Sequence, residues 1–196
     1  MNSTVLSTAY YDKNAQIFYD RTIHADMSQN QNLFLAHLKS KAKILDIGCG
    51  VGRDAYFFEQ QGYDVLAFDG SQEMVNRANQ ILKQPAKHMF FNDINFDQEF
   101  EGAWAAASLL HVPNDYLKDI FAKIYSALKP KGIFFMSFKQ GEGELKQEGR
   151  TFYYQTQESL APHFNSLFAI VEIWTKKDTC TFRSEQTWLN ILLKKI

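Results

Sequence analysis

From residue 43 onward, short apolar runs alternate with stretches in which apolar side chains recur every three or four positions. Short apolar runs favour buried strands, whereas the three-to-four spacing favours helices that bury one face. Strands that alternate with helices are typical of a parallel sheet with helices packed on its faces. The pattern therefore predicts an α/β fold of the Rossmann-like, doubly wound class, with a single domain over residues 1–196.

The expected sheet is seven-stranded and mostly parallel, with an antiparallel last strand. The predicted strands are residues 43–47, 64–68, 87–91, 103–109, 133–138, 168–175 and 187–193. The predicted core helices are residues 54–61, a helix that Ser71 caps and that runs to residue 82, residues 117–128 and residues 156–164. Residues 141–150 hold three glycines and many charges, so we predict an exposed loop there.

Two further helices, residues 13–21 and 29–38, are predicted ahead of the first strand. Because they precede the core, residues 41–196, we expect residues 1–40 to form an N-terminal helical cap that acts as a lid. Aromatic rings in this cap either close over a bound cation or pack the helices onto the sheet. These aromatic residues are Tyr10, Tyr11, Phe18 and Tyr19.

Composition and charge limit the classes of partner that the protein can have. The chain carries 21 Lys and Arg against 22 Asp and Glu, so its net charge is -1 and its pI is near 6.5. This balance gives no general attraction to phosphate backbones, which disfavours nucleic acid as a partner. The first residues lack the basic and apolar regions of a signal peptide, and no apolar stretch approaches the ~20 residues that span a bilayer. We therefore expect a cytoplasmic protein without membrane contact, as a monomer or homodimer.

Two cysteines are too few for a disulfide framework, and they lack the spacing of metal ligands. We expect Cys49 to be a small filler of a turn and Cys180 to lie in a surface loop. The chemistry must therefore come from other side chains.

The most informative segment is the glycine turn Gly48-Cys-Gly-Val-Gly52, between the first strand and the next helix. Closely spaced glycines let a ligand approach the backbone and meet a helix N-terminus. A dinucleotide site has its third glycine three positions after the second, where this chain has Arg53. Asp54 also places a carboxylate at the positive end of the helix, which disfavours a pyrophosphate. A different cofactor and a purely structural turn both remain open at this point.

Three acids follow three successive strands. Asp46 stands at the end of the first strand, where a carboxylate can bind an amino group. Asp69 follows the second strand about 20 residues after the glycines, which is where a ribose-binding acid is placed. Asp93 follows the third strand and can accept a hydrogen bond from an adenine amine, while a neighbouring backbone N–H donates to the ring. Each acid alone also fits a turn or a helix start, but three together favour a nucleoside ligand.

These segments resemble the class I S-adenosylmethionine-dependent methyltransferases. The similar segments are residues 44–52, 68–71, 92–94 and 128–132, within a resemblance over about residues 35–196. Residues 107–113 and 137–144 are similar to the small bacterial, tellurite-resistance-like group. The resemblance implies S-adenosyl-L-methionine as cofactor and S-adenosyl-L-homocysteine as product. It also implies the cofactor-binding residues Tyr11, Asp46, Gly48, Cys49, Gly50, Arg53, Asp69, Gly70, Asp93, Ile94, Ser108 and Leu109.

A small-molecule acceptor is expected near the ends of the fourth and fifth strands, because ligands bind at the carboxyl ends of parallel strands. The implied mechanism is in-line displacement of the methyl group. His111 is the candidate catalytic residue, either as a general base or as a structural histidine of the turn. The other acceptor-side candidates are Ser108, Leu109, Leu110, Phe138, Lys139, Tyr153 and Tyr154.

Three alternative functions stay open. The first is a non-catalytic S-adenosylmethionine-binding module that acts as a sensor or regulator. The second is an NAD-type oxidoreductase, which Arg53 disfavours. The third is an RNA methyltransferase, which the neutral charge disfavours.

Overall fold

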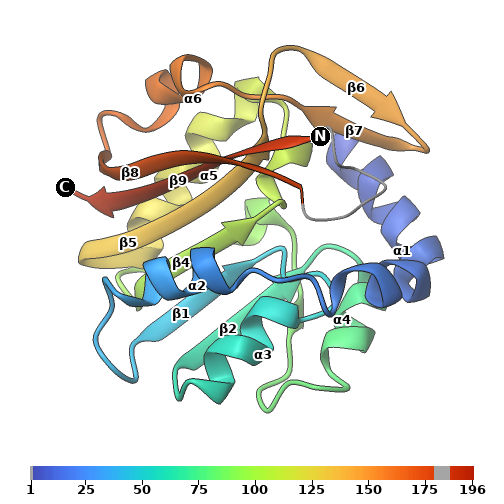
Figure 1. The fold of residues 1–196 in the computed structure, drawn as a ribbon, viewed down its shortest axis with the longest axis horizontal. Coiled ribbons are helices and arrows are strands. Elements are labelled where there is room, and N and C mark those ends of the chain that lie inside the picture. The colour runs from blue at the N-terminus through green and yellow to red at the C-terminus, as the bar shows by residue number, and fades with distance from the viewer. Residues whose placement is uncertain (1, 179–185) are drawn as a thin grey trace.

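The computed structural model describes residues 2–178 and 186–196, so Cys180 lies outside the described residues. A central sheet carries helices on both faces (Figure 1). Its strands, in spatial order, are β3 (Lys87–His88), β2 (Asp64–Asp69), β1 (Lys43–Ile47), β4 (Phe100–Ala106), β5 (Leu128–Lys139), β9 (Thr187–Lys195) and β8 (Phe168–Lys177). The first five run parallel, and β9 pairs antiparallel with both β5 and β8. The predicted seven-stranded sheet with an antiparallel last strand is confirmed.

Helices from different parts of the chain cover the two faces. They are α1 (Asn2–Thr22), α2 (Ser28–Leu35), α3 (Arg53–Gln60), α4 (Gln72–Ala78), α5 (Asn114–Ala127) and α6 (Gln157–Phe164), with single 3-10 turns η1 (Phe91–Asp93) and η2 (Leu109–His111). Strand residues alternate between the faces, so Leu45 packs with α5 and α6 while Ile44 packs with α2, α3 and α4. The fully buried strand residues fit a sheet that is covered on both sides.

Local chemistry explains where several helices begin and end. Gly62 follows α3 with φ of 84°, a left-handed conformation that glycine adopts without steric cost. Ser71 caps α4, because its side-chain oxygen accepts a hydrogen bond from the backbone N–H of Met74. Thr156 caps α6 in the same way through the N–H of Ser159. These ends agree with the predicted ones within one or two residues, whereas α4 stops at Ala78, four residues short of the predicted end.

The prediction of a loop over residues 141–150 is wrong. Strands β6 (Glu144–Gln147) and β7 (Arg150–Tyr153) form an antiparallel hairpin there. Its two turn residues, Glu148 and Gly149, have φ of 51° and 77°, and positive φ at both positions is the geometry of a tight hairpin turn. Because β6 is exposed throughout, it lacks the alternation of apolar residues that would have indicated a strand.

The bounds of other predicted strands also differ from the structure. β3 ends at His88, and residue 91, its predicted end, is the first residue of the 3-10 turn η1. β4 spans Phe100–Ala106 and not residues 103–109. Ala107 has a left-handed φ of 53°, which ends the strand, and η2 follows. Within the described residues, no helix has the length and apolar character that a membrane crossing requires.

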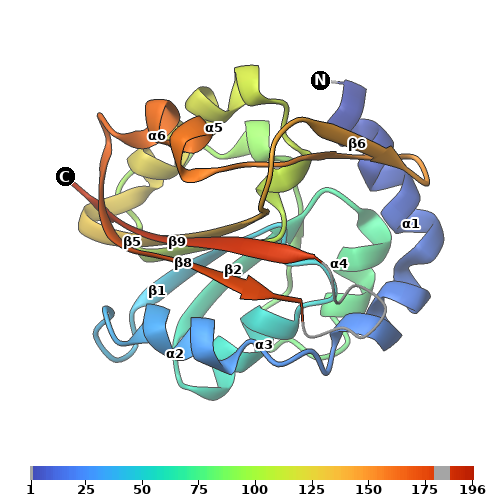
Figure 2. The same ribbon diagram turned by 45° about the horizontal axis from the view of Figure 1, so that its top comes forward.

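The predicted N-terminal cap consists of two differently placed helices. α2 belongs to the core, since the buried ring of Phe34 lies 5.6 Å from that of Phe58 and 5.2 Å from that of Trp104. α1 lies instead against α4 and β7 (Figure 2). It bends at Asn14, whose backbone is non-helical and whose side-chain amide donates to the carbonyl of Tyr10. α1 is therefore the part of the predicted cap that lies outside the two large core clusters, and its action as a lid stays a prediction.

Candidate functional site

A cavity of about 690 Å³ lies at the carboxyl ends of the parallel strands. Residues that follow β1, β2 and β4 line it, together with the end of β5, and α1 and the β6–β7 hairpin add further walls. This position is where open α/β sheets bind ligands, and the volume is in the range of small-molecule sites. The cavity therefore has the place and size of an active site.

The glycine turn forms one wall of this cavity. The backbone N–H groups of Gly48 and Cys49 both donate to the carbonyl of Phe68, at 2.9 Å, which fixes the turn on β2. A Cβ at Gly48 would lie 2.5 Å from that of Ser108, so only glycine fits there. The φ of Gly50 is 54°, a left-handed value that favours glycine. A Cβ at this position would nevertheless meet no atom within 4 Å. The backbone at Gly50 therefore borders open space, which a ligand can occupy.

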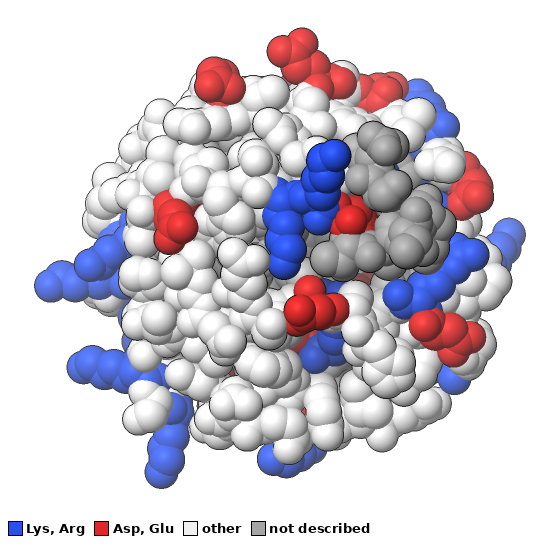
Figure 3. Space-filling model, in the orientation of Figure 1, with Lys and Arg blue, Asp and Glu red and all other residues white. Residues whose placement is uncertain are grey.

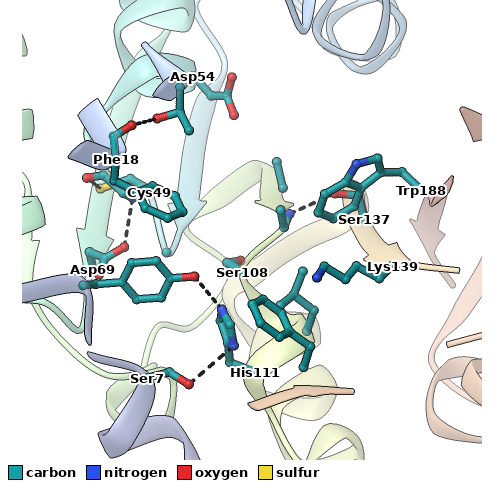
Figure 4. A pocket seen from close by; sticks show the side chains of 18 of the residues that line it. Ser7, Phe18, Cys49, Asp54, Asp69, Ser108, His111, Ser137, Lys139 and Trp188 are labelled. Carbon is teal, nitrogen blue, oxygen red and sulfur yellow. Dashed lines mark hydrogen bonds between the residues drawn. The ribbon is translucent and has the colours of Figure 1, made fainter. Parts of the chain in front are cut away.

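Asp69 links the end of β2 to this turn (Figure 4). One carboxylate oxygen accepts from the N–H of Gly50 and the other from the N–H of Ser71, both at 2.9 Å. Burial raises the pKa of Asp69 despite these two hydrogen bonds. The carboxylate has lone pairs left for hydroxyl groups of a ligand.

Asp46 is the least satisfied acid of the site. Its side chain is 2% exposed, and its Oδ2 has no hydrogen-bond partner among the described residues. Burial and the neighbouring charge of Asp54 raise its pKa well above the usual value. A buried carboxylate oxygen without a partner is costly, so Oδ2 indicates a ligand that brings a cation or a donor.

Asp54, in contrast, is fully paired within the protein. It accepts hydrogen bonds from Arg53, Gln31 and the indole of Trp104 at 2.8–2.9 Å. Burial alone would raise its pKa, but the charge of Arg53 and these hydrogen bonds lower it. Asp54 thus anchors the start of α3 to α2 and β4.

His111 is held at both ring nitrogens. Nδ1 lies 2.7 Å from the carbonyl of Thr151 and Nε2 lies 2.8 Å from the hydroxyl of Tyr11. Because a carbonyl only accepts, Nδ1 carries the proton and Nε2 accepts from Tyr11. Burial lowers the pKa of His111 to about 4, with help from the charges of Arg150 and Lys139, and burial raises the pKa of Tyr11 to about 12. Both groups are therefore neutral at physiological pH.

The structure brings most of the predicted site residues together. Those that line the cavity are Tyr11, Asp46, Gly48, Cys49, Gly50, Arg53, Asp69, Gly70, Ser108, Leu110, His111, Lys139 and Tyr154. Burial raises the pKa of the Cys49 thiol well above its usual value, which suits a filler and not a nucleophile.

Other predicted residues do not line the cavity. Asp93 is exposed, and its carboxylate accepts from the backbone N–H of Phe90, the residue that precedes η1. Ile94, Leu109 and Phe138 lie in the hydrophobic core. At this edge of the cavity the structure places Phe90 and Phe91 instead of Asp93.

Sequence reasoning missed several residues on the far side of the cavity. Arg150 and Phe152 come from β7, and Trp188 and Asn190 from β9. The indole of Trp188 donates to Asp178 at 3.0 Å. No local motif marks these residues, because the pairing of β9 with β5 and the fold of the hairpin bring them to the site.

Comparisons with known proteins agree with this geometry. The family model described as "Methyltransferase domain" matches residues 19–178. YqeM of Bacillus subtilis, which is named as a methyltransferase, is 28% identical over 63% of this chain. The malonyl-[acyl-carrier protein] O-methyltransferase of Salmonella typhimurium is 31% identical, also over 63% of the chain. The two matches span 53% and 51% of these relatives, so the chain corresponds to about half of their length.

A solved structure has the same fold over nearly the whole chain. It is the 1,6-didemethyltoxoflavin-N1-methyltransferase of Burkholderia thailandensis, with S-adenosylhomocysteine bound. The TM-score is 0.80 at 22% identity, over 99% of this chain and 88% of that one. This likeness confirms the Rossmann-like architecture. The tellurite-resistance-like subgroup stays a prediction.

Proposed function

This chain belongs to the methyltransferase family whose domain model matches residues 19–178, and on that premise we propose that it transfers a methyl group from S-adenosylmethionine to a small-molecule acceptor. The observation that carries the proposal is the buried, unpartnered carboxylate oxygen of Asp46 beside the glycine turn. It lies in a cavity that continues past this turn to the end of β5, so there is room for a second molecule.

The donor end of the cavity fits S-adenosylmethionine. Asp46 offers a buried acceptor to the ammonium group, and Asp69 offers its remaining lone pairs to the ribose hydroxyls. The open space beside Gly50 admits the chain of the ligand close to the backbone. Phe90 and Phe91 supply apolar surface for the adenine ring.

The protein contributes chiefly position and the exclusion of water. When bound, S-adenosylmethionine supplies an electrophilic methyl group on a positively charged sulfur. The walls from α1 and the β6–β7 hairpin restrict access of water, and the two ends of the cavity hold the reactants side by side. Such orientation can lower a barrier by about 7–11 kcal/mol.

We assign His111 a positioning role. Its Nε2 accepts a hydrogen bond from the Tyr11 hydroxyl, so a proton from the methyl acceptor reaches this nitrogen only by way of that hydroxyl. The low pKa of His111, about 4, also disfavours an imidazolium. The imidazole instead fixes the Tyr11 ring at the cavity wall and joins it to β7 through Thr151.

Calorimetric titration with S-adenosylmethionine, S-adenosylhomocysteine and NAD tests the donor site. One site for the first two and none for NAD is the expected result, and binding of NAD alone would contradict the proposal. Release of S-adenosylhomocysteine, measured over a panel of thiols, amines, phenols and carboxylates, then tests catalysis. Donor binding without release on any acceptor would favour the sensor module.

A further inference from the structure

Two hydroxyl groups border the middle of the cavity, between the donor end and the end of β5. They are the phenol of Tyr11 on α1 and the side chain of Ser108, which follows β4. Figure 4 shows Ser108 and His111 between Asp69 on one side and Trp188 on the other. Donor and acceptor meet in this part of the cavity, so the hydrogen bonds that these hydroxyls can still make bear on the acceptor.

The hydroxyl of Tyr11 has no proton left for a ligand. It donates to Nε2 of His111 at 2.8 Å, because Nδ1 carries the imidazole proton and donates to the carbonyl of Thr151. Burial raises the pKa of Tyr11 to about 12, although the charge of Arg150 and a hydrogen bond from it act in the opposite direction. The Tyr11 oxygen therefore offers a ligand lone pairs only, and Arg150 engages one of them.

Ser108 is fixed in the same state. Its Oγ donates to the backbone carbonyl of Ile47 at 2.6 Å, which uses its single proton. The residue is 7% exposed, and none of the described residues donates to its Oγ. Ser137, at the end of β5, differs, because its Oγ accepts from the N–H of Ala107 at 2.9 Å and keeps its own proton. The lone pairs of Ser108 are therefore open to a ligand that brings an N–H or O–H group.

A third oxygen of the cavity also only accepts. The carbonyl of Trp188 accepts from Nδ2 of Asn190 at 3.4 Å, and Oδ1 of Asn190 accepts from Nδ2 of Asn30 at 3.0 Å. These two bonds fix the direction of both amides. They leave Oδ1 of Asn30 buried without a partner in the described part of the chain, where the residue lines the cavity from α2. A ligand that fills this cavity therefore meets acceptors at three places.

Charge favours an uncharged ligand beside these oxygens. Acidic and basic side chains are mixed over the face of the molecule seen in Figure 3, so this face does not attract ligands of one sign. Beside Tyr11, the guanidinium of Arg150 pairs with Glu148 at 2.7 Å, and its buried Nε is a donor without a partner among the described residues. The positive charge of Arg150 disfavours a protonated amine at this place.

From these hydrogen-bond directions, and given the proposed function, we propose that the methyl acceptor is a neutral aromatic amine whose N–H group donates to the oxygens of Tyr11 and Ser108. Aromatic amines are neutral at physiological pH, whereas aliphatic amines are protonated. Phe152, Tyr154 and Trp188 line the cavity beyond the two oxygens and supply apolar surface for the ring.

Other nucleophiles fit the two oxygens less well. Thiolates, phenolates and carboxylates bring no hydrogen, so their negative charge would meet the lone pairs of Tyr11 and Ser108. An alcohol brings a hydrogen but has to lose it to a base as the carbon–oxygen bond forms, and Tyr11 already occupies Nε2 of His111. A neutral amine keeps its N–H bond while its lone pair reacts.

Transfer to such an amine needs no base in the protein. The lone pair of the nitrogen forms the new bond to the methyl carbon, and the carbon–sulfur bond breaks with its electron pair left on sulfur. The products are S-adenosylhomocysteine and an N-methylated ammonium, which then releases its proton to water. The neutral state of His111 agrees with this route.

Binding of indoline and of dihydrobenzofuran, in which oxygen replaces the N–H group, tests this proposal. Each is titrated, by calorimetry, into the full chain in the presence of excess S-adenosylhomocysteine. Indoline should bind more tightly by about fivefold or more, because only indoline has an N–H group to donate. The double variant Tyr11→Phe/Ser108→Ala should remove this preference. Its matched control, Tyr116→Phe/Ser126→Ala at exposed positions of α5, should leave the preference intact.

Equal affinities of wild type for the two molecules would overturn the proposal, as would no measurable binding of either or an unchanged preference in Tyr11→Phe/Ser108→Ala. The comparison in wild type needs no variant to fold. Titration of S-adenosylhomocysteine alone separates the two proposals. If the product binds but indoline is not preferred, the proposed function stands and the amine is rejected. If the product does not bind but the preference for indoline persists, the proposed function fails and the N–H site remains.

Discussion

The hydroxyl of Tyr11 donates to Nε2 of His111 at 2.8 Å, across 100 positions of the chain. This hydrogen bond ties α1 to the turn that follows β4, and the other ring nitrogen of His111 binds Thr151 on β7. One imidazole thus joins three elements that border the cavity. We therefore expect its protonation state to affect both the stability of the fold and the position of α1.

The stability of the protein should depend on the titration of His111. Its pKa is about 4 in the folded protein and about 6.5 when exposed, so between these values the unfolded chain binds the proton and the folded protein does not. Stability is therefore lost as the pH falls through this window, by about 2 kcal/mol between pH 7.5 and pH 5. Urea unfolding of wild type and His111→Gln at both pH values measures the loss.

The variant should show a smaller loss than wild type, because glutamine does not titrate. All other groups contribute alike to the two proteins, so the difference isolates His111. The same pH dependence in both would show that His111 titrates normally in the folded state.

Asp46→Asn should separate ligand binding from stability. The raised pKa of Asp46 means that its ionised form is disfavoured in the folded protein, so its contribution to stability falls as the pH rises above the unfolded pKa. Without ligand at pH 7.5, the variant should melt at the same or a higher temperature than wild type. Its affinity for S-adenosylhomocysteine should fall by about tenfold or more, because a charge-assisted bond to the ammonium is lost.

Asp119→Asn, at an exposed position of α5, is the matched control. Calorimetry and thermal melts give both readouts on the same samples. An unchanged affinity in Asp46→Asn would mean that this carboxylate does not contact the ligand.

Asp69→Ala should weaken both the donor site and the fold. The carboxylate accepts from two backbone N–H groups and, as proposed, from the ribose hydroxyls, so affinity for S-adenosylhomocysteine should fall by about tenfold or more. Ser71→Ala is the comparison, because it removes the cap of α4 and should cost about 0.5–2 kcal/mol of stability. Equal losses of affinity in the two variants would mean that Asp69 only holds the local backbone and does not contact the ligand.

α1 should open less often when the donor site is filled. Cleavage by trypsin after Arg21 requires α1 to unwind, and ligand that binds only the closed form slows it by the factor 1 + [L]/Kd. At a tenfold excess of S-adenosylhomocysteine over Kd, the rate should drop by about tenfold.

Tyr11→Phe removes the hydrogen bond to His111 and should speed cleavage in the absence of ligand, whereas Tyr116→Phe on the exposed side of α5 should not. Equal rates with and without S-adenosylhomocysteine would exclude α1 as a lid over the bound donor.

Sequence patterns were sufficient to predict those elements whose structure neighbouring residues determine. The strands β1 and β2 were predicted within one residue because each is a short apolar run with turn signals at its ends. The glycine turn with Asp46 and Asp69 was found for the same reason. Backbone freedom at Gly48 and Gly50 is a property of the residue itself, and the ends of parallel strands necessarily meet at one edge.

Only the tertiary structure decided which distant groups face one another. The sequence placed His111 after β4 but could not show that Tyr11 and Thr151 hold both of its ring nitrogens. It suggested Asp93 for the site, whereas the local backbone N–H of Phe90 binds that carboxylate. It also gave no sign that Phe152 covers the ammonium of Lys139, because the exposed hairpin lacks a periodic apolar pattern. Periodicity and turn chemistry act over a few residues, while the contacts of His111 and Lys139 join separate elements of the fold, which no local pattern encodes.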